Sequence, residues 1–221
     1  MFLNLKVALI IISSTEQMND IKFSIKLNKK IFHDLINPTA AALNGLELLK
    51  DDMIQHNPDT LDKEIIALID KSINKISCQI QIMRFAYSDP LNKFDEIDLL
   101  EFEGLISNYL SHTKLKLKEV YKGIPINKSK AIIIANLILL IVDLFPIGGE
   151  ILFGTKGSNV YIKGTPKDKK INTVLANLIE NKVHEEYKEN IQYSYIKSLL
   201  NLMGIKLIFN ISDETLLIEE E

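Results

Sequence analysis

Two long amphipathic stretches near the N-terminus constrain the fold of this 221-residue chain more than any other feature. Between Asp20 and Tyr87 the sequence contains a single glycine, Gly45, and apolar residues recur every three or four positions, which is typical of helices that bury one face. The polar run from Gln55 to Thr60 holds an Asn–Pro step, and this step disfavours helix at the residue before the proline. The sequence therefore predicts two long helices that fold back on each other as an antiparallel hairpin.

A lone helical hairpin cannot bury apolar side chains on several sides of both helices. Two copies of the hairpin can bury them by packing as a four-helix bundle. The pattern thus predicts a homodimer. The alternative is that the hairpin packs on the C-terminal half of its own chain.

The pattern changes after the break at Ser88-Asp89-Pro90. Helical and alternating segments are mixed from there on, and their order indicates an α+β sandwich, a sheet with helices on one face. Helices are predicted over 96–110, 129–145, 170–183 and 190–203, and strands over 115–118, 150–153, 159–163, 205–210 and 215–219. The predicted domains are an N-terminal extension over 1–19, the hairpin over 20–88 and the sandwich over 95–221.

The composition of the chain argues against several classes of protein. A formal net charge of -3 leaves no basic excess for binding nucleic acid. The single cysteine, Cys78, excludes an internal disulfide, and we expect it to be a small core residue. The apolar runs 7–12 and 131–142 are shorter than the roughly 20 residues that a membrane-spanning helix needs, and no signal peptide is apparent. We therefore expect a cytoplasmic protein with no membrane span.

The candidate chemistry lies on the first predicted helix, around His33 and Asp34. A neutral imidazole is a nucleophile near pH 7, and the neighbouring Asp34 carboxylate can accept a hydrogen bond from the ring and orient it. Pro38 removes the backbone donor that would bond to the carbonyl of Asp34, which loosens the helix one turn after His33. Taken alone, these residues favour an ordinary surface histidine over a nucleophile.

The neighbours of His33 along the helix are small or polar. At 100° per residue, one arc of about 80° holds five side chains. These are His33, Asn37, Ala40, Asn44 and Glu47. The pattern predicts that this face points to solvent, because the apolar positions lie on or beyond its flank.

Residues 32–38, Phe-His-Asp-Leu-Ile-Asn-Pro, resemble the phosphoacceptor motif of histidine kinase dimerisation domains, in which an acidic residue follows the His and a proline stands five positions on. The longer run 33–49 resembles the ChpT-type histidine phosphotransferases. Residues 135–149 and 190–200 resemble the same family, so the resemblance covers about residues 25–221. The family commonly has Arg where Ile147 stands, and residues 1–20 have no recognisable counterpart.

This resemblance implies the fold of a sensor kinase core, a dimeric hairpin followed by a degenerate ATPase-like domain. A phosphoryl group would pass from the phospho-Asp of a receiver domain in a hybrid histidine kinase to His33, and then to the Asp of a response regulator. Mg²⁺ would reside in the receiver domain, and this chain would bind no cofactor or metal. Six residues are expected to contact the partner, although each also fits an ordinary helical position. They are Asn37, Ala40, Ala41, Asn44, Gly45 and Glu47.

The motifs for ATP are missing from the sequence. Kinases of this fold hold Mg²⁺ with an Asn four residues after the position that matches Asn136, and Leu140 stands there. An Asp-x-Gly-x-Gly motif and a later glycine-rich lid do not occur, and we expect Gly148-Gly149 and Gly154 to Gly157 in turns. The chain is therefore predicted to be a phosphotransferase that does not use ATP. The alternatives are a non-catalytic dimeric adaptor that docks receiver domains and an active sensor histidine kinase.

Overall fold

The computed structural model describes residues 2–55, 63–91, 96–121, 126–157, 159–180, 190–212 and 214–221. The chain divides into two compact units, Met1–Ile69 and Asp70–Glu221. The predicted division into an extension, a hairpin and a sandwich stays a prediction.

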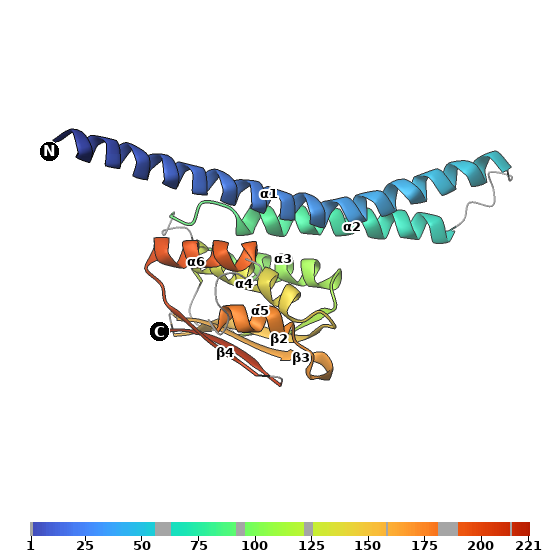
Figure 1. Cartoon of the computed structure of the whole chain (residues 1–221). Helices are drawn as coiled ribbons and strands as arrows, with labels where there is room; N and C mark the ends of the chain where they lie inside the picture. Colours follow the sequence, from blue (N-terminus) through green and yellow to red (C-terminus); the bar gives the residue numbers. More distant parts are fainter. Residues whose placement is uncertain are drawn as a thin grey trace. The chain divides into compact units, whose positions relative to one another are not determined.

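The first unit consists of helix α1 (Phe2–Gln55) and the start of helix α2 (Lys63–Ala86) (Figure 1). Residues 2–19 continue into the predicted hairpin helix without a break. Glu64 lies in the first turn of α2, where a carboxylate interacts favourably with the helix dipole. The predicted turn after Gln55 lies outside the described residues.

One face of α1 is buried and carries Pro38, Ala42 and Gly45, which are spaced four and three residues apart. A Cβ atom added to Gly45 would lie 2.7 Å from Cγ1 of Ile69 in α2. The absence of a side chain at Gly45 therefore lets the two helices approach closely at this point.

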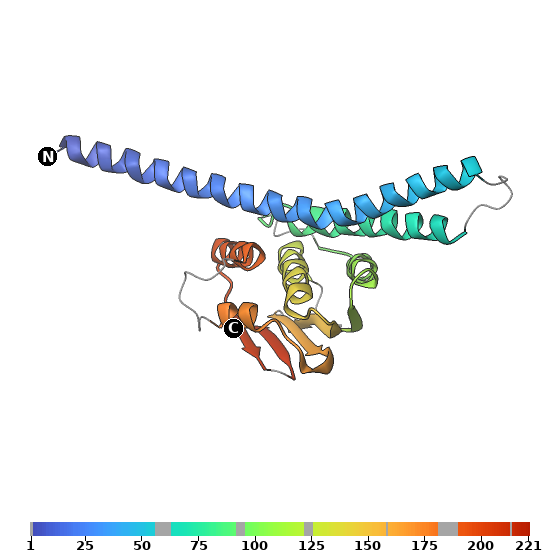
Figure 2. The same cartoon turned by 45° about the vertical axis from the view of Figure 1, so that its right-hand side comes forward.

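Pro38 lies inside α1 and does not end it. The hydroxyl of Thr39 donates a 2.7 Å hydrogen bond to the carbonyl of Leu35, one turn earlier. Such hydroxyl bonds and internal prolines both bend helices. In both views α1 is bowed along its length (Figures 1 and 2).

The second unit contains a five-stranded sheet with strand order β1-β2-β3-β5-β4. The strands are β1 (Leu115–Tyr121), β2 (Gly149–Lys156), β3 (Asn159–Pro166), β4 (Leu207–Ile211) and β5 (Leu216–Glu220). Strands β1 and β2 are parallel and joined through helix α4 (Lys128–Leu144), whereas the other pairs are antiparallel. The remaining elements are α3 (Leu99–Ser111), the short 3-10 helix η2 (Lys167–Lys169), α5 (Thr173–Ile179) and α6 (Ile191–Met203).

Helices α3, α4 and α6 lie side by side over one face of the sheet (Figure 2). Helix α4 is the centre of the core, and most of its residues are buried, including Ile132, Leu137 and Ile141. Phe153 and Ile162 are also fully buried in the sheet. Each such side chain contributes about 1.5–3 kcal/mol by its burial. The mixed helix-and-sheet architecture predicted for the C-terminal part is therefore confirmed.

Two details of the sequence prediction are wrong. Gly154 lies within β2, paired with Tyr161, because the ladder between β2 and β3 extends to Lys156 and Asn159. The turn glycine is Gly157, with φ +61°. The helix predicted over 170–183 starts too early, because the first helical residue of α5 is Thr173. The side chain of Asn172 accepts a hydrogen bond from the amide of Leu175 and caps the N-terminus of α5. Residues 181–189 lie outside the described part of the chain.

A buried hydrogen-bond network fixes the C-terminal end of α2 to the sandwich. The Asn136 amide donates to the carbonyl of Ala86 at 2.7 Å and accepts from Nε2 of Gln192 at 2.9 Å. The Tyr87 hydroxyl donates to Oε1 of Gln192 at 2.8 Å. Asn136 and Gln192 are fully buried, so these polar groups depend on one another for their hydrogen bonds.

Candidate phosphoacceptor site on α1

His33 projects from the middle of α1 and leaves 76% of its side chain exposed. Its Nδ1 atom lies 3.3 Å from Oδ1 of Asp34, a long hydrogen bond in which the protonated Nδ1 donates. Nε2 has no hydrogen-bond partner among the described residues. In this tautomer the lone pair of Nε2 is accessible to an electrophile in solution.

Asp34 is less exposed than His33, with 28% of its side chain accessible. Nζ of Lys30, one turn earlier on α1, lies 3.4 Å from Oδ2 of Asp34. Lys30 therefore extends the site to a Lys–Asp–His series in which each side chain contacts the next. Lys30 was not among the residues predicted from the sequence, although its spacing of four residues from Asp34 is the signal that would have indicated it.

All five residues of the predicted arc are exposed on α1. They are His33, Asn37, Ala40, Asn44 and Glu47. Of the other two expected partner residues, Ala41 is half-buried and Gly45 is buried against Ile69. The structure explains Gly45 by packing within the hairpin, because its Cα faces α2 and not the exposed arc.

An apolar stripe runs along α1 beside the arc of His33. It consists of Ile25, Phe32, Ile36, Leu43 and Leu46, and each of these side chains is at least 41% exposed. Their spacing of seven, four, seven and three residues is the heptad spacing of helices that pack against other helices. At 100° per residue the stripe is centred about 90° from His33. His33 therefore lies between an exposed apolar stripe and the buried face of α1.

Other groups of the chain have less capacity for chemistry. Cys78 is partly exposed, and burial raises the pKa of its thiol, which lowers the thiolate fraction at neutral pH. Within the described ranges, no three His, Cys, Asp or Glu side chains form a group that could hold a metal ion. No helix in the part of the chain that the structure describes has the length and apolar character to cross a membrane.

The two positions discussed for ATP are both in the core of the sandwich. Leu140 is 1% exposed in α4. The amide of Asn136 is occupied by the carbonyls of Ala86 and Ile132 and by Gln192. Neither side chain offers a ligand atom to a cation in this arrangement.

A curated relative and a solved structure that resemble this chain are both phosphotransferases. The protein phosphotransferase ChpT of Brucella abortus (strain 2308) is 26% identical to this chain over 133 residues, which is 60% of each protein. The chain thus matches about three-fifths of the length of that curated relative. A solved structure of a bacterial phosphotransferase at 1.7 Å resolution is 22% identical, covers 91% of this chain and 96% of its own, and has a TM-score of 0.73. That likeness shows a shared fold.

The sequence model of the histidine phosphotransferase C-terminal domain matches residues 99–215. This range begins with the first residue of α3 and includes β1 to β4, so it covers most of the sandwich and more than half of the chain. The resemblance drawn from the sequence is thereby confirmed, and the chain belongs to the histidine phosphotransferase family.

Proposed function

We propose that this chain is a histidine phosphotransferase of a bacterial phosphorelay. His33 accepts a phosphoryl group from the phospho-Asp of a receiver domain in a hybrid histidine kinase and passes it to the Asp of a response regulator. The observation that carries the proposal is the geometry of His33, a 76% exposed imidazole whose Nδ1 faces Asp34 while Nε2 is unpartnered among the described residues.

This geometry supports a transfer in two steps. The lone pair of Nε2 attacks the phosphorus of the aspartyl phosphate, an N–P bond forms, and the P–O bond to the donor carboxylate breaks with that carboxylate as the leaving group. The proton stays on Nδ1, so the phosphorylated ring carries a positive charge that the Asp34 carboxylate stabilises. In the second step the carboxylate of the response regulator attacks the same phosphorus, and neutral His33 leaves.

Asp34 and Lys30 are positioning residues in this proposal. Lys30 contacts one carboxylate oxygen of Asp34, and the other oxygen faces His33. The ion pair of Lys30 is an i,i+4 pair on a helix and contributes only about 0.3–0.5 kcal/mol to stability. Its proposed effect is to restrict the rotamer of Asp34, so that the ring of His33 keeps one tautomer.

The exposed arc around His33 is the proposed docking surface for the receiver domain. Asn37 and Asn44 supply amide donors, Glu47 supplies a carboxylate, and Ala40 leaves room for a packed helix. Mg²⁺ supplies charge neutralisation at the phosphoryl oxygens, and we expect it in the receiver domain. The core positions of Leu140 and Asn136 support a transfer that does not use ATP.

We also infer that the active form is a homodimer. A stripe of five large apolar side chains, each 41–63% exposed, is costly to leave in water along a single helix. A second copy of the hairpin would cover the stripe by forming a four-helix bundle. Because His33 lies beside the stripe, its imidazole would stay accessible at the edge of that interface.

Mixing the purified chain with a radiolabelled phospho-receiver tests the proposal. The expected product is an acid-labile, base-stable label on the chain, and His33→Gln abolishes it. His112→Gln is the matched control, because His112 is the half-exposed C-cap residue of α3 and the variant should keep the label. Label on the His33→Gln variant would refute the site. Receiver binding without any label would indicate the adaptor instead.

A further inference from the structure

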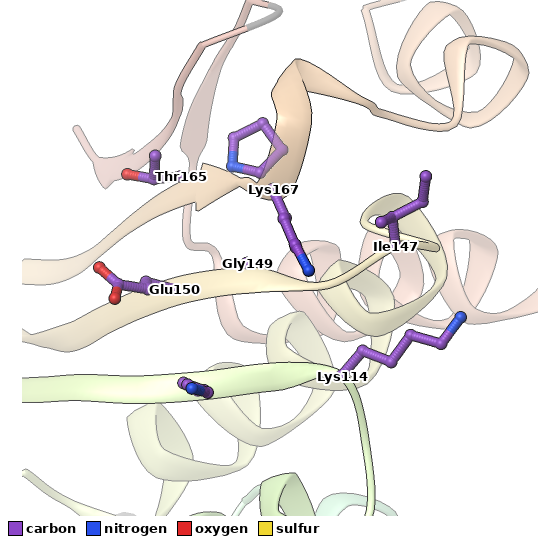
Figure 3. A pocket seen from close by; sticks show the side chains of 8 residues that line it. Lys114, Ile147, Gly149, Glu150, Thr165 and Lys167 are labelled. Atoms are coloured by element: carbon purple, nitrogen blue, oxygen red, sulfur yellow. The ribbon is translucent and has the colours of Figure 1, made fainter.

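An open pocket of about 670 Å³ lies in the sandwich, where β1 and β2 begin and β3 ends. Figure 3 shows its lining side chains over the start of β2, with Lys167 reaching across toward Gly149 and Lys114 on the side of Ile147. No residue of this pocket belongs to the site around His33.

The register of the strands creates the pocket. Lys116, Glu150 and Thr165 are direct cross-strand neighbours on β1, β2 and β3. Two residues further along, Gly148 and Gly149 lie between two lysines. The amide of Lys167 donates to the carbonyl of Gly148 at 2.8 Å, and the amide of Gly149 donates to the carbonyl of Lys114 at 3.4 Å.

A side chain cannot replace the glycine at this point. Gly148 has φ +100°, and a Cβ atom built there would lie 2.1 Å from the carbonyl oxygen of Lys114. The space between Lys114 and Lys167 therefore holds no side chain at position 148, and the next residue, Gly149, lines the pocket with backbone alone.

The side chains that line the pocket carry more positive than negative charge. Three lysines, Lys114, Lys116 and Lys167, surround it, and its carboxylate, Glu150, lies 3.5 Å from Nζ of Lys118. Nζ of Lys114 donates to the carbonyl of Pro146 at 3.2 Å. Neither Lys116 nor Lys167 has an ion-pair partner among the described residues. Like charges that share a hollow repel one another, and an anion bound between them removes this repulsion.

We propose that this pocket binds a small phosphate monoester with an apolar or aromatic body. The phosphate is held by the ammonium groups of Lys116 and Lys167, with Lys114 at the rim. The body of the ligand lies against the apolar walls formed by Ile147 and Pro166. A volume of about 670 Å³ is within the usual range of small-molecule sites, about 300–1,000 Å³. The site is independent of phosphotransfer at His33.

Isothermal titration calorimetry of the full chain with phenyl phosphate, AMP, adenosine and inorganic phosphate tests the proposal. Phenyl phosphate and AMP should bind, adenosine should not, and inorganic phosphate should bind about tenfold more weakly because it lacks the apolar body. The double variant Lys116→Gln/Lys167→Gln should lose at least about tenfold in affinity for both monoesters, since charge-assisted hydrogen bonds to phosphate are lost.

The matched control is Lys197→Gln/Lys206→Gln, which removes the same charge beside a second pocket next to β4, at the other edge of the sheet. It should bind the monoesters like the unmodified chain. Ile147→Ser should bring the affinity for phenyl phosphate close to that for inorganic phosphate. Equal losses in both double variants would mean attraction to net charge alone and would overturn the proposal. Failure of the unmodified chain to bind either monoester would overturn it as well.

Discussion

Asn136→Ala is the substitution whose cost the structure determines best. The side chain is fully buried, and its removal leaves the buried carbonyl of Ala86 without its amide donor. Nε2 of Gln192 loses its 2.9 Å bond to the Asn136 side chain and keeps a long 3.5 Å bond to the backbone carbonyl of residue 136. An unsatisfied buried group costs about 1–3 kcal/mol, so the loss at Ala86 alone should lower the unfolding free energy by about 1–3 kcal/mol. Urea unfolding followed by circular dichroism measures this loss.

The control is Asn108→Ala, which removes the same amide from an exposed position of α3 and should change stability by less than about 0.5 kcal/mol. The double variant Asn136→Ala/Gln192→Ala should lose less than the sum of the two single variants, because both break the same hydrogen bond. A loss below about 1 kcal/mol for Asn136→Ala, or strict additivity of the pair, would refute the reasoning about the buried network.

Three further predictions concern the hairpin. Phe32→Asp/Ile36→Asp should convert the proposed dimer to a monomer in analytical ultracentrifugation. Leu100→Asp, at a still more exposed apolar position of the sandwich, should not; a monomeric unmodified chain would contradict the interface. Asp34→Asn should slow phosphotransfer about tenfold while the affinity for the receiver is retained. The variant loses a hydrogen bond to a charged group that is worth about 1.4 kcal/mol, and this energy corresponds to a tenfold change in rate. An unchanged rate would show that Asp34 does not belong to the site. Cys78 should react with iodoacetamide more slowly than a free cysteine at mildly alkaline pH, because burial raises its pKa and the reactive thiolate forms only at higher pH; equal rates would contradict this.

Local patterns in the sequence were sufficient to place most of the helices, although not all of their ends, and to predict the exposed arc around His33. Helical periodicity depends on neighbours three and four residues apart, so the exposed positions of α1 follow from spacing alone. The stretch from Asn190 to Met203 was predicted for the same reason, and α6 occupies it.

Contacts between distant parts of the chain could not be predicted from local spacing in the sequence. Asn136 and Gln192 are 56 residues apart, and only the packing of α6 against α4 brings them together. The pocket joins Lys114 and Lys167 through the register of three strands, which the sequence pattern does not specify. Gly45 was assigned to a partner surface because helical spacing alone does not show which small residue meets α2.

In the proposed function, Nε2 of His33 carries the phosphoryl group. Tandem mass spectrometry under alkaline conditions, after transfer from a phosphorylated receiver domain, localises the phosphate, and ³¹P NMR of the same sample identifies the nitrogen to which it is bonded. We expect a single phosphohistidine per protomer, at His33 and bonded through Nε2. A phosphate on a carboxylate, on another histidine or on Nδ1 of His33 would contradict it.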